Sequence, residues 1–280
     1  MDLSIFFIVV LAAFLHATWN VLVKTHDDRL VGLTILQTLM GVMGIVMLLW
    51  FGLPSSEAYG YALASGILHT GYNLFLVRAY KTADLSQVYP IARGTAPLLT
   101  LVGTYFLLHD NTSIMLAIAI FILVTGLLLT GLGPRNAAAH DPHALFYALG
   151  TAAFIASYTL VDGMGARKSA NAFGYAGLLF VLDGMFLLIA GFLQRGRGFA
   201  LAMLPHWRRG MLGALASGAA YALVIWAMTK APIASVAALR ETSIVFVMIL
   251  SARVLNEALN WQRVGGCLLI LVGAALLRFA

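Results

Sequence analysis

The chain has 280 residues, of which 61% are hydrophobic and only 10% are charged, and its mean hydropathy is +0.93. Water-soluble proteins have about 25% charged residues, so this composition excludes a soluble globular domain and predicts an integral membrane protein. The net charge of +6 needs no nucleic acid to explain it, because basic loops beside anionic lipid account for such an excess. The single cysteine, Cys267, excludes an intramolecular disulfide and a cysteine-rich metal site.

Long apolar stretches recur along the whole chain. Each is long enough for a helix that crosses a hydrocarbon core of about 30 Å, and longer than barrel strands of about 9–11 residues. We therefore expect an all-α integral membrane protein with ten transmembrane helices and no separate soluble domain. The ten predicted spans are 3–23, 31–51, 58–79, 86–108, 112–132, 144–162, 172–193, 209–229, 233–254 and 261–279.

The first and third predicted spans contain related pentapeptides, HATWN at 16–20 and HTGYN at 69–73. Positions i, i+3 and i+4 share one helix face, so each pentapeptide groups a histidine, an aromatic ring and an asparagine. Such faces turn away from lipid, either toward a substrate cavity or into hydrogen bonds between helices, and both interpretations are open. The candidate substrate-binding residues are His16, Trp19 and Asn20 in the first set and His69, Tyr72 and Asn73 in the second.

The fourth predicted span contains VYPIARGTAP, in which Pro90 and Pro97 each remove a helical donor. We expect a broken or kinked helix here, with free backbone carbonyl groups facing a cavity. Tyr89 and Arg93 share a face with Pro97 and are candidate substrate-binding residues.

Two halves of the chain are related, because residues 79–130 align without gaps on residues 227–278. We expect a first five-helix repeat at 1–132, a linker at 133–143 and a second five-helix repeat at 144–280. Because five is odd, the second repeat must enter the membrane in the opposite sense from the first. This inverted plan is typical of secondary transporters, whose substrate sites lie near the membrane midplane between the repeats.

Ionisable side chains at membrane depth are costly and normally face a partner or a wet cavity. Two candidates, Arg93 and Arg240, would bind an anionic group of the substrate. Glu241 and Asp183 would take an ammonium group or a coupling proton. A structural ion pair of Arg93 with Glu241 or Asp183 is the alternative. The five predicted intramembrane charges are Arg93, Asp162, Asp183, Arg240 and Glu241.

The remaining candidates are single residues on the later spans. Tyr158 and Tyr221 stand beside polar residues on the predicted sixth and eighth spans and complete the candidate cavity lining, although taken singly such rings are ordinary packing residues. Asp162 lies at the end of its predicted span, before Gly163 and Arg167, and is interpreted as a cap or an interfacial residue.

The second half ends with LNEALNWQRVGGCLLILVGAALL at 255–277. This ending, with five spans duplicated to ten, resembles the EamA-type branch of the drug/metabolite transporter superfamily. Members usually have Gly-Glu where this chain has Asn256 and Glu257, and the first half departs further with His109 and Asp110. The resemblance covers essentially the whole chain. It implies a cavity lined mainly by the first, third, fourth, sixth, eighth and ninth spans, and solutes that include amino acids, nucleotide-linked sugars and drugs.

Lysine and arginine are distributed unevenly among the predicted loops, and cytoplasmic loops carry the excess of these residues. This bias predicts cytoplasmic odd-numbered loops and external termini, whereas the resemblance implies internal termini. The odd-numbered loops hold Lys24, Arg29, Arg78, Lys81, Arg135, Arg195, Arg197, Arg208, Arg209, Arg253 and Arg263. The even side holds Arg167, Lys168, Lys230 and Arg278.

No motif of a metalloprotease, a nucleotide-binding loop, a nucleophilic serine or a calcium loop is present, so we expect no enzyme, no cofactor and no metal. The expected function is a secondary transporter that moves a small polar metabolite, an amino acid or a related zwitterion or anion, across a bacterial-type inner membrane. Its expected partners are the solute, membrane lipid and a coupling proton; an oligomer is compatible but not required. The alternatives are a drug or organic-phosphonate transporter, and a non-transporting membrane sensor or subunit.

Overall fold

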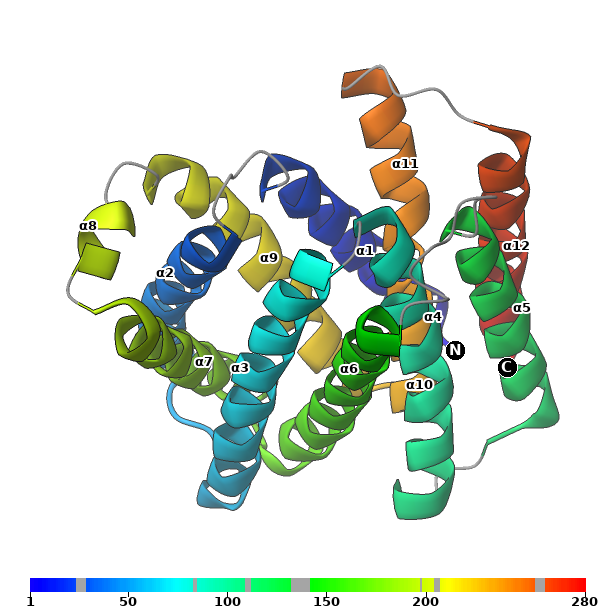
Figure 1. The fold of residues 1–280 in the computed structure, drawn as a ribbon. Coiled ribbons are helices and arrows are strands. Elements are labelled where there is room, and N and C mark those ends of the chain that lie inside the picture. The colour runs from blue at the N-terminus through cyan, green and yellow to red at the C-terminus, as the bar shows by residue number, and fades with distance from the viewer. Residues whose placement is uncertain are drawn as a thin grey trace.

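The computed structural model describes residues 1–23, 29–82, 85–108, 112–131, 142–196, 198–203, 207–254 and 260–280. These residues form helices, and no strand occurs among them. The helices, drawn in Figure 1, are α1 Leu3–Val23, α2 Arg29–Phe51, η1 Ser56–Ala58, α3 Tyr59–Thr82, α4 Leu85–Gly103, η2 Thr104–Leu108, α5 Ile114–Gly131, α6 Pro142–Lys168, α7 Ala172–Arg195, α8 Gly198–Met203, α9 Trp207–Met228, α10 Ile233–Arg240, α11 Ser243–Val254 and α12 Trp261–Leu277.

Each of the ten predicted spans overlaps a helix or a pair of consecutive helices. Within the described part of the chain, eight helical segments are long and apolar enough to cross a membrane. The other two predicted spans correspond to α3, which carries several polar side chains, and to α12, which has 17 residues. The multi-pass helical fold is therefore shown, and the count of ten remains a prediction.

Polar residues and glycine set several of the helix ends. Gly52 adopts a φ of +79° after α2, a conformation that costs glycine little, and its N–H donates to Leu48 O at 2.9 Å. The side chain of Asn171 accepts from the Gly174 N–H at the start of α7, and Asn260 accepts from the Arg263 N–H at the start of α12. These caps supply partners for backbone donors that the helices leave open.

Three features of the helices bear on the predicted site and differ from what the sequence predicts. α6 runs on to Lys168 and does not end at residue 162, so Asp162 lies inside a helix rather than at its end. α4 continues through Pro90 and Pro97, and the predicted break in the fourth span is not found there. Proline is tolerated inside membrane helices because neighbouring groups can satisfy the backbone that it frees. The break lies instead in the ninth span, between α10 and α11.

Packing is mostly between the halves of the chain, and it follows a two-fold pattern. α2 packs against α7, and α5 packs against α12, so equivalent helices of the two halves meet each other. α1 packs against α9 and α11, whereas α6 packs against α3 and α4. The first helix of each half thus contacts the third and fourth helices of the other half, as a two-fold relation between repeats requires. Figure 1 shows the α5 and α12 pair at one side of the bundle.

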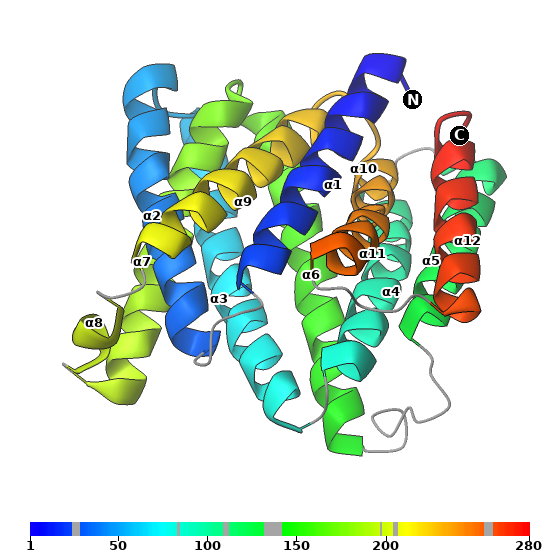
Figure 2. The same cartoon turned by 90° about the horizontal axis from the view of Figure 1, so that it is seen from above.

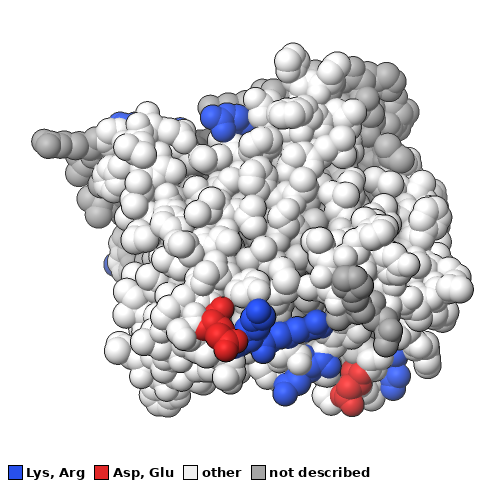
Figure 3. Space-filling model, turned by 90° about the horizontal axis from the view of Figure 1, so that it is seen from below, with Lys and Arg blue, Asp and Glu red and all other residues white. Residues whose placement is uncertain are grey.

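The two ends of the described chain lie together. The Met1 ammonium group donates to Arg278 O at 3.0 Å, and Figure 2 shows the N- and C-termini on the same side of the bundle. In the face drawn in Figure 3, most of the charged side chains lie near two opposite edges, with a broad uncharged area between them. Large apolar side chains such as Leu49, Phe106 and Ile114 are exposed, which suits a lipid environment. The predicted linker lies mainly outside the described residues.

Candidate functional site

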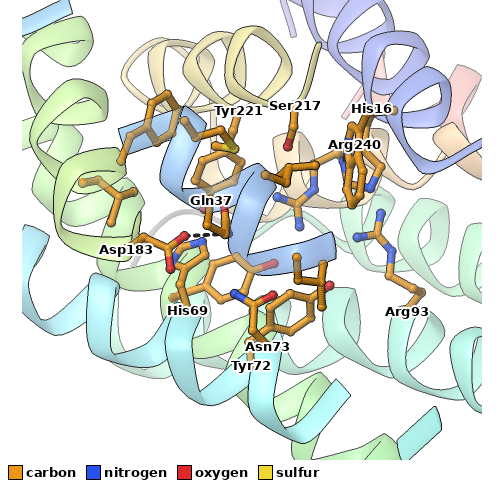
Figure 4. Close-up of a pocket in the computed structure, with 17 residues that line it drawn as sticks. His16, Gln37, His69, Tyr72, Asn73, Arg93, Asp183, Ser217, Tyr221 and Arg240 are labelled. Carbon is orange, nitrogen blue, oxygen red and sulfur yellow. Dashed lines mark hydrogen bonds between the residues drawn. The ribbon is translucent and has the colours of Figure 1, made fainter. Parts of the chain in front are cut away.

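A cavity of about 80 Å³ lies inside the bundle, between the two halves of the chain. Pockets for drug-sized ligands have volumes of about 300–1,000 Å³, so the cavity in this conformation is small. Eight helices contribute to its wall, and Figure 4 shows the polar side chains that turn into it. The lining residues are His16, Trp19, Leu33, Leu36, Gln37, Met40, His69, Tyr72, Asn73, Arg93, Tyr158, Leu179, Phe180, Asp183, Ser217, Tyr221 and Arg240.

The break in the ninth span places two opposite charges beside the cavity. α10 ends at Arg240 and α11 begins at Ser243. Backbone hydrogen bonds between residues three apart stabilise the turn between the two helices. The Glu241 N–H donates to Ala238 O at 3.0 Å, and the Ile244 N–H donates to Glu241 O at 3.1 Å. A helix C-terminus favours a cation and a helix N-terminus favours an anion. The break therefore stabilises the buried Arg240 guanidinium after α10 and the buried Glu241 carboxylate before α11.

Arg93 and Glu241 form an ion pair across the two halves. The distance from Arg93 Nε to Glu241 Oε2 is 2.8 Å, and both side chains are almost fully buried. Arg93 Nη2 also lies 3.5 Å from Ser243 Oγ, at the start of α11. Arg93 still lines the cavity, but Glu241 does not. The structural alternative that the sequence left open, an Arg93–Glu241 pair, is thus present.

Arg240 differs from Arg93, because no carboxylate of the described residues forms an ion pair with it. Its guanidinium lies over the ring of Tyr221, with 5.8 Å from Cζ to the ring centroid. Its Nε atom is buried and has no hydrogen-bond partner in this part of the chain. Arg240 is therefore a cation of the cavity wall whose charge is not neutralised by a carboxylate.

A carboxylate lies on the opposite side of the cavity. Gln37 Nε2 donates to Asp183 Oδ2 at 2.7 Å, which joins α2 to α7. The other acceptors of this pair, Gln37 Oε1 and Asp183 Oδ1, are buried and have no hydrogen-bond partner among the described residues. Figure 4 shows this pair across the cavity from Arg240 and Arg93. The cavity thus has a cationic side and an anionic side.

The two related pentapeptides lie on the same cavity but use their polar groups differently. In the first, Trp19 Nε1 donates to His16 Nδ1 at 3.2 Å, and Asn20 Nδ2 donates to the His16 backbone carbonyl at 2.9 Å. Asn20 therefore satisfies its own helix and does not line the cavity, so its prediction as a cavity residue was wrong. The side chain of an asparagine can donate a hydrogen bond to the backbone carbonyl four residues earlier in its own helix. Helical spacing alone does not show whether it does so.

In the second pentapeptide, the His69 Nδ1 atom lies 3.0 Å from the backbone oxygen of Ser65 and 3.1 Å from its hydroxyl. The His69 ring stacks on Tyr158 at 3.9 Å between centroids. Asn73 lines the cavity with 1% of its surface exposed, and its Nδ2 atom has no partner within the described chain. The second pentapeptide thus contributes a free amide donor that the first does not.

The structure brings most of the predicted site residues together. Ten of them line the cavity; Asn20 and Glu241 do not, and the side chain of Tyr89 lies outside the described residues. That these residues bind a substrate or carry protons stays a prediction. The ten are His16, Trp19, His69, Tyr72, Asn73, Arg93, Tyr158, Asp183, Tyr221 and Arg240.

Sequence reasoning missed the contribution of α2. Gln37 is an uncharged amide within the apolar segment TILQTLMG, and we did not count it among the costly intramembrane groups. Ser217 lies in ALASG, a segment that the chain repeats, and the repeat gave no sign of its orientation. The resemblance implied other spans as the main cavity lining, whereas α2 and α7 supply seven of the lining residues here. A polar residue at mid-span was the signal that could have identified Gln37.

Comparisons with known proteins agree with this architecture. The model of the EamA-like transporter family matches residues 3–132 and 143–279. A solved structure titled only as the crystal structure of a protein superposes with a TM-score of 0.71. It is 16% identical, and the alignment covers 99% of this chain and 98% of that chain, so it supports the fold alone. No curated protein is significantly similar in sequence.

Proposed function

The chain belongs to the EamA-like transporter family, and on that premise we propose that it is a secondary transporter for a small zwitterion, with an amino acid as the favoured class. The observation that carries this proposal is the pairing of unsatisfied groups around the cavity. Within the described part of the chain, Arg240 Nε and Asn73 Nδ2 are donors without an acceptor, whereas Gln37 Oε1 and Asp183 Oδ1 are acceptors without a donor. Buried polar groups are normally paired, so each needs a partner that a ligand can supply.

The charge of the two sides indicates the orientation of the ligand. A carboxylate of the substrate would pair with Arg240, whose guanidinium suits planar anions. An ammonium group would pair with Asp183, and the rings of Tyr158, Tyr221 and Phe180 would contact the apolar part. Arg93 is already paired with Glu241, which leaves Arg240 as the cavity guanidinium that forms no ion pair with a carboxylate of the described residues. This favours a single carboxylate over a phosphonate, which would use two.

The remaining features of the proposal concern the membrane. We place the protein in a bacterial-type inner membrane with ten spans, a count that is even, as the contact between the two termini requires. Asp183 is the proposed carrier of a coupling proton, since it lines the cavity and has no cationic partner among the described residues. Glu241 is the second candidate, although its pairing with Arg93 restricts its protonation.

A thermal-shift comparison of matched compounds tests the ligand class. L-Alanine carries both charges, propionate lacks the ammonium group, and ethylamine lacks the carboxylate. Longer and aromatic amino acids complete the series, each with its own analogue without the ammonium group and its own analogue without the carboxylate. We expect stabilisation only by members that carry both charges, followed by flux of those members in reconstituted vesicles. Equal stabilisation by the singly charged analogues, or binding without any flux, would contradict a zwitterion transporter, and the second result would support a sensor.

A further inference from the structure

The carboxyl group of Asp162 is a buried polar group that the proposed substrate site does not use. It lies within α6 and is 0% exposed. The Tyr175 hydroxyl donates to Asp162 Oδ1 at 3.0 Å, and the Tyr221 hydroxyl donates to Asp162 Oδ2. No lysine or arginine of the described residues forms an ion pair with Asp162. A buried carboxylate with only neutral hydrogen-bond donors is costly, so its neutral form competes with the ionised form.

The groups that face Asp162 come from three helices. They are Ser65 and His69 on α3, Tyr175 and Asp183 on α7, and Tyr221 on α9. His69 interacts electrostatically with both Asp162 and Asp183. Asp162 therefore shares one buried cluster with a second carboxyl group and an imidazole ring.

Tyr221 connects Asp162 to the cavity. Its hydroxyl is bound to Asp162, while its ring lies beneath the Arg240 guanidinium and contacts His69 at 5.5 Å between centroids. An ionised carboxyl accepts hydrogen bonds at both oxygens, but a protonated carboxyl carries a donor of its own. Protonation of Asp162 therefore changes the hydrogen bonding that the Tyr221 hydroxyl can make with this carboxyl group. Tyr175 does not line the cavity, whereas Tyr221 does.

We propose that Asp162 is a proton-binding site that is coupled through Tyr221 to the anion site at Arg240. The inference deepens the proposed function, because it adds a proton site to the same transporter. A substrate carboxylate on Arg240 adds negative charge on the cavity side of the Tyr221 ring, whose hydroxyl is bound to Asp162, and favours the neutral form of Asp162. Substrate and proton therefore bind together, and binding weakens by up to about tenfold per pH unit above the titration midpoint of Asp162.

Infrared spectroscopy of the purified protein tests the proton site without any ligand. The carbonyl stretch of a protonated carboxylic acid is followed between pH 4 and pH 9. We expect a titrating band that is lost in Asp162→Asn and kept in Asp183→Asn and Glu241→Gln. If Asp162→Asn removes no titrating band, because Asp162 stays ionised or stays protonated throughout, the proposal is overturned. If Asp162→Asn does not fold, the variants Tyr175→Phe and Tyr221→Phe, which keep the Asp162 carboxyl group, are measured in its place.

The coupling to the cavity has a matched pair of controls. Arg240→Gln removes the cation that lies over the Tyr221 ring, so the titration midpoint of Asp162 should shift. The shift of the midpoint caused by Arg240→Gln should persist when Tyr175→Phe is added and should be smaller when Tyr221→Phe is added. An equal shift in both double variants would overturn the role of Tyr221. L-Alanine then serves as the ligand probe, with proton uptake on binding as the readout. If L-alanine and its longer relatives fail to bind, the proposed ligand class fails, while the infrared titration still decides the proton site.

Discussion

Arg93 of α4 and Glu241, which follows α10, form an ion pair that joins the two repeats inside the membrane, with an Nε to Oε2 distance of 2.8 Å. The two residues coincide when residues 79–130 are aligned on 227–278, so equivalent positions of the repeats carry opposite charges. Such a pair provides each charged side chain with a counter-charge, which lowers the cost of burying both of them at membrane depth. It also connects α4 to the break between α10 and α11, where the cavity wall is formed.

The first prediction concerns this pair. Glu241→Gln leaves the Arg93 guanidinium buried without its counter-charge, and loss of one partner of a buried pair costs about 3–5 kcal/mol. We expect a clear loss of stability in thermal unfolding of the detergent-solubilised protein. The double variant Arg93→Gln with Glu241→Gln should recover a large part of the loss.

The opposite outcome would assign Glu241 a different role. A Glu241→Gln variant that is as stable as the wild type, but whose flux no longer depends on pH, would show that Glu241 carries the coupling proton. In that case the ion pair is a transient state and not a fixed lock between the repeats.

The second prediction separates the two sides of the cavity. Arg240→Gln should weaken binding of a zwitterion by about 10- to 150-fold, because hydrogen bonds to charged groups contribute about 1.5–3 kcal/mol. Asp183→Asn should weaken the same ligand and reduce discrimination against the analogue that lacks the ammonium group. Isothermal titration with a zwitterion and its two analogues measures both effects. Arg278→Gln, a partly buried position directly after α12 that does not line the cavity, is the control. Uniform losses for all three compounds would refute the assignment of the two sides.

The third prediction uses the asparagines of the two pentapeptides as a matched pair. Asn73 lines the cavity, and its Nδ2 atom has no hydrogen-bond partner among the described residues, whereas Asn20 donates to the carbonyl of His16 in its own helix. Asn73→Ala should raise the half-saturation constant for transport by about 2- to 13-fold, from the loss of one hydrogen bond of about 0.5–1.5 kcal/mol. Asn20→Ala should leave transport kinetics unchanged. Equal effects of the two substitutions in vesicle uptake would show that Asn73 makes no contact with the substrate.

The fourth prediction concerns orientation in the membrane. The excess of Lys and Arg in the odd-numbered loops predicts external termini, and the contact of Met1 with Arg278 O requires both termini on one face. Alkaline phosphatase fused after the C-terminus should therefore be active in a bacterial host. An inactive phosphatase together with a fluorescent cytoplasmic reporter at the same position would reverse the assignment.

Much of the fold could be predicted from the sequence, because composition and the length of apolar runs are strong signals. Each predicted span has a helix, and the duplicated segments correctly indicated two related halves. The position of the helix break could not be predicted. Two prolines in VYPIARGTAP suggested the fourth span, but α4 is continuous, and the ninth span is broken at Arg240 to Ser243, where no proline is present. Charges next to helix ends, rather than proline, accompany the break.

The site was predictable in part, for a related physical reason. Helical spacing grouped His69, Tyr72 and Asn73 correctly on the cavity, since period alone defines a face. The same spacing failed for Asn20, whose amide bonds to its own backbone. It also could not rank Arg93 against Arg240, because only the packing shows that Glu241 pairs with Arg93.

The last prediction tests the close contact between the repeats at α5 and α12, using two adjacent glycines. A Cβ atom at Gly266 would lie 2.7 Å from Gly126 O and 2.7 Å from Thr130 Cγ2, whereas a Cβ atom at Gly265 would meet nothing within 4 Å. Gly266→Ala must therefore separate the two helices, at a cost of about 1–3 kcal/mol. Gly265→Ala should be neutral or stabilising, since alanine favours a helix over glycine by about 1 kcal/mol. Thermal unfolding of the two variants measures the difference. Because the substitutions are chemically identical and one residue apart, equal stabilities would show that α5 and α12 do not depend on this contact to hold the repeats together.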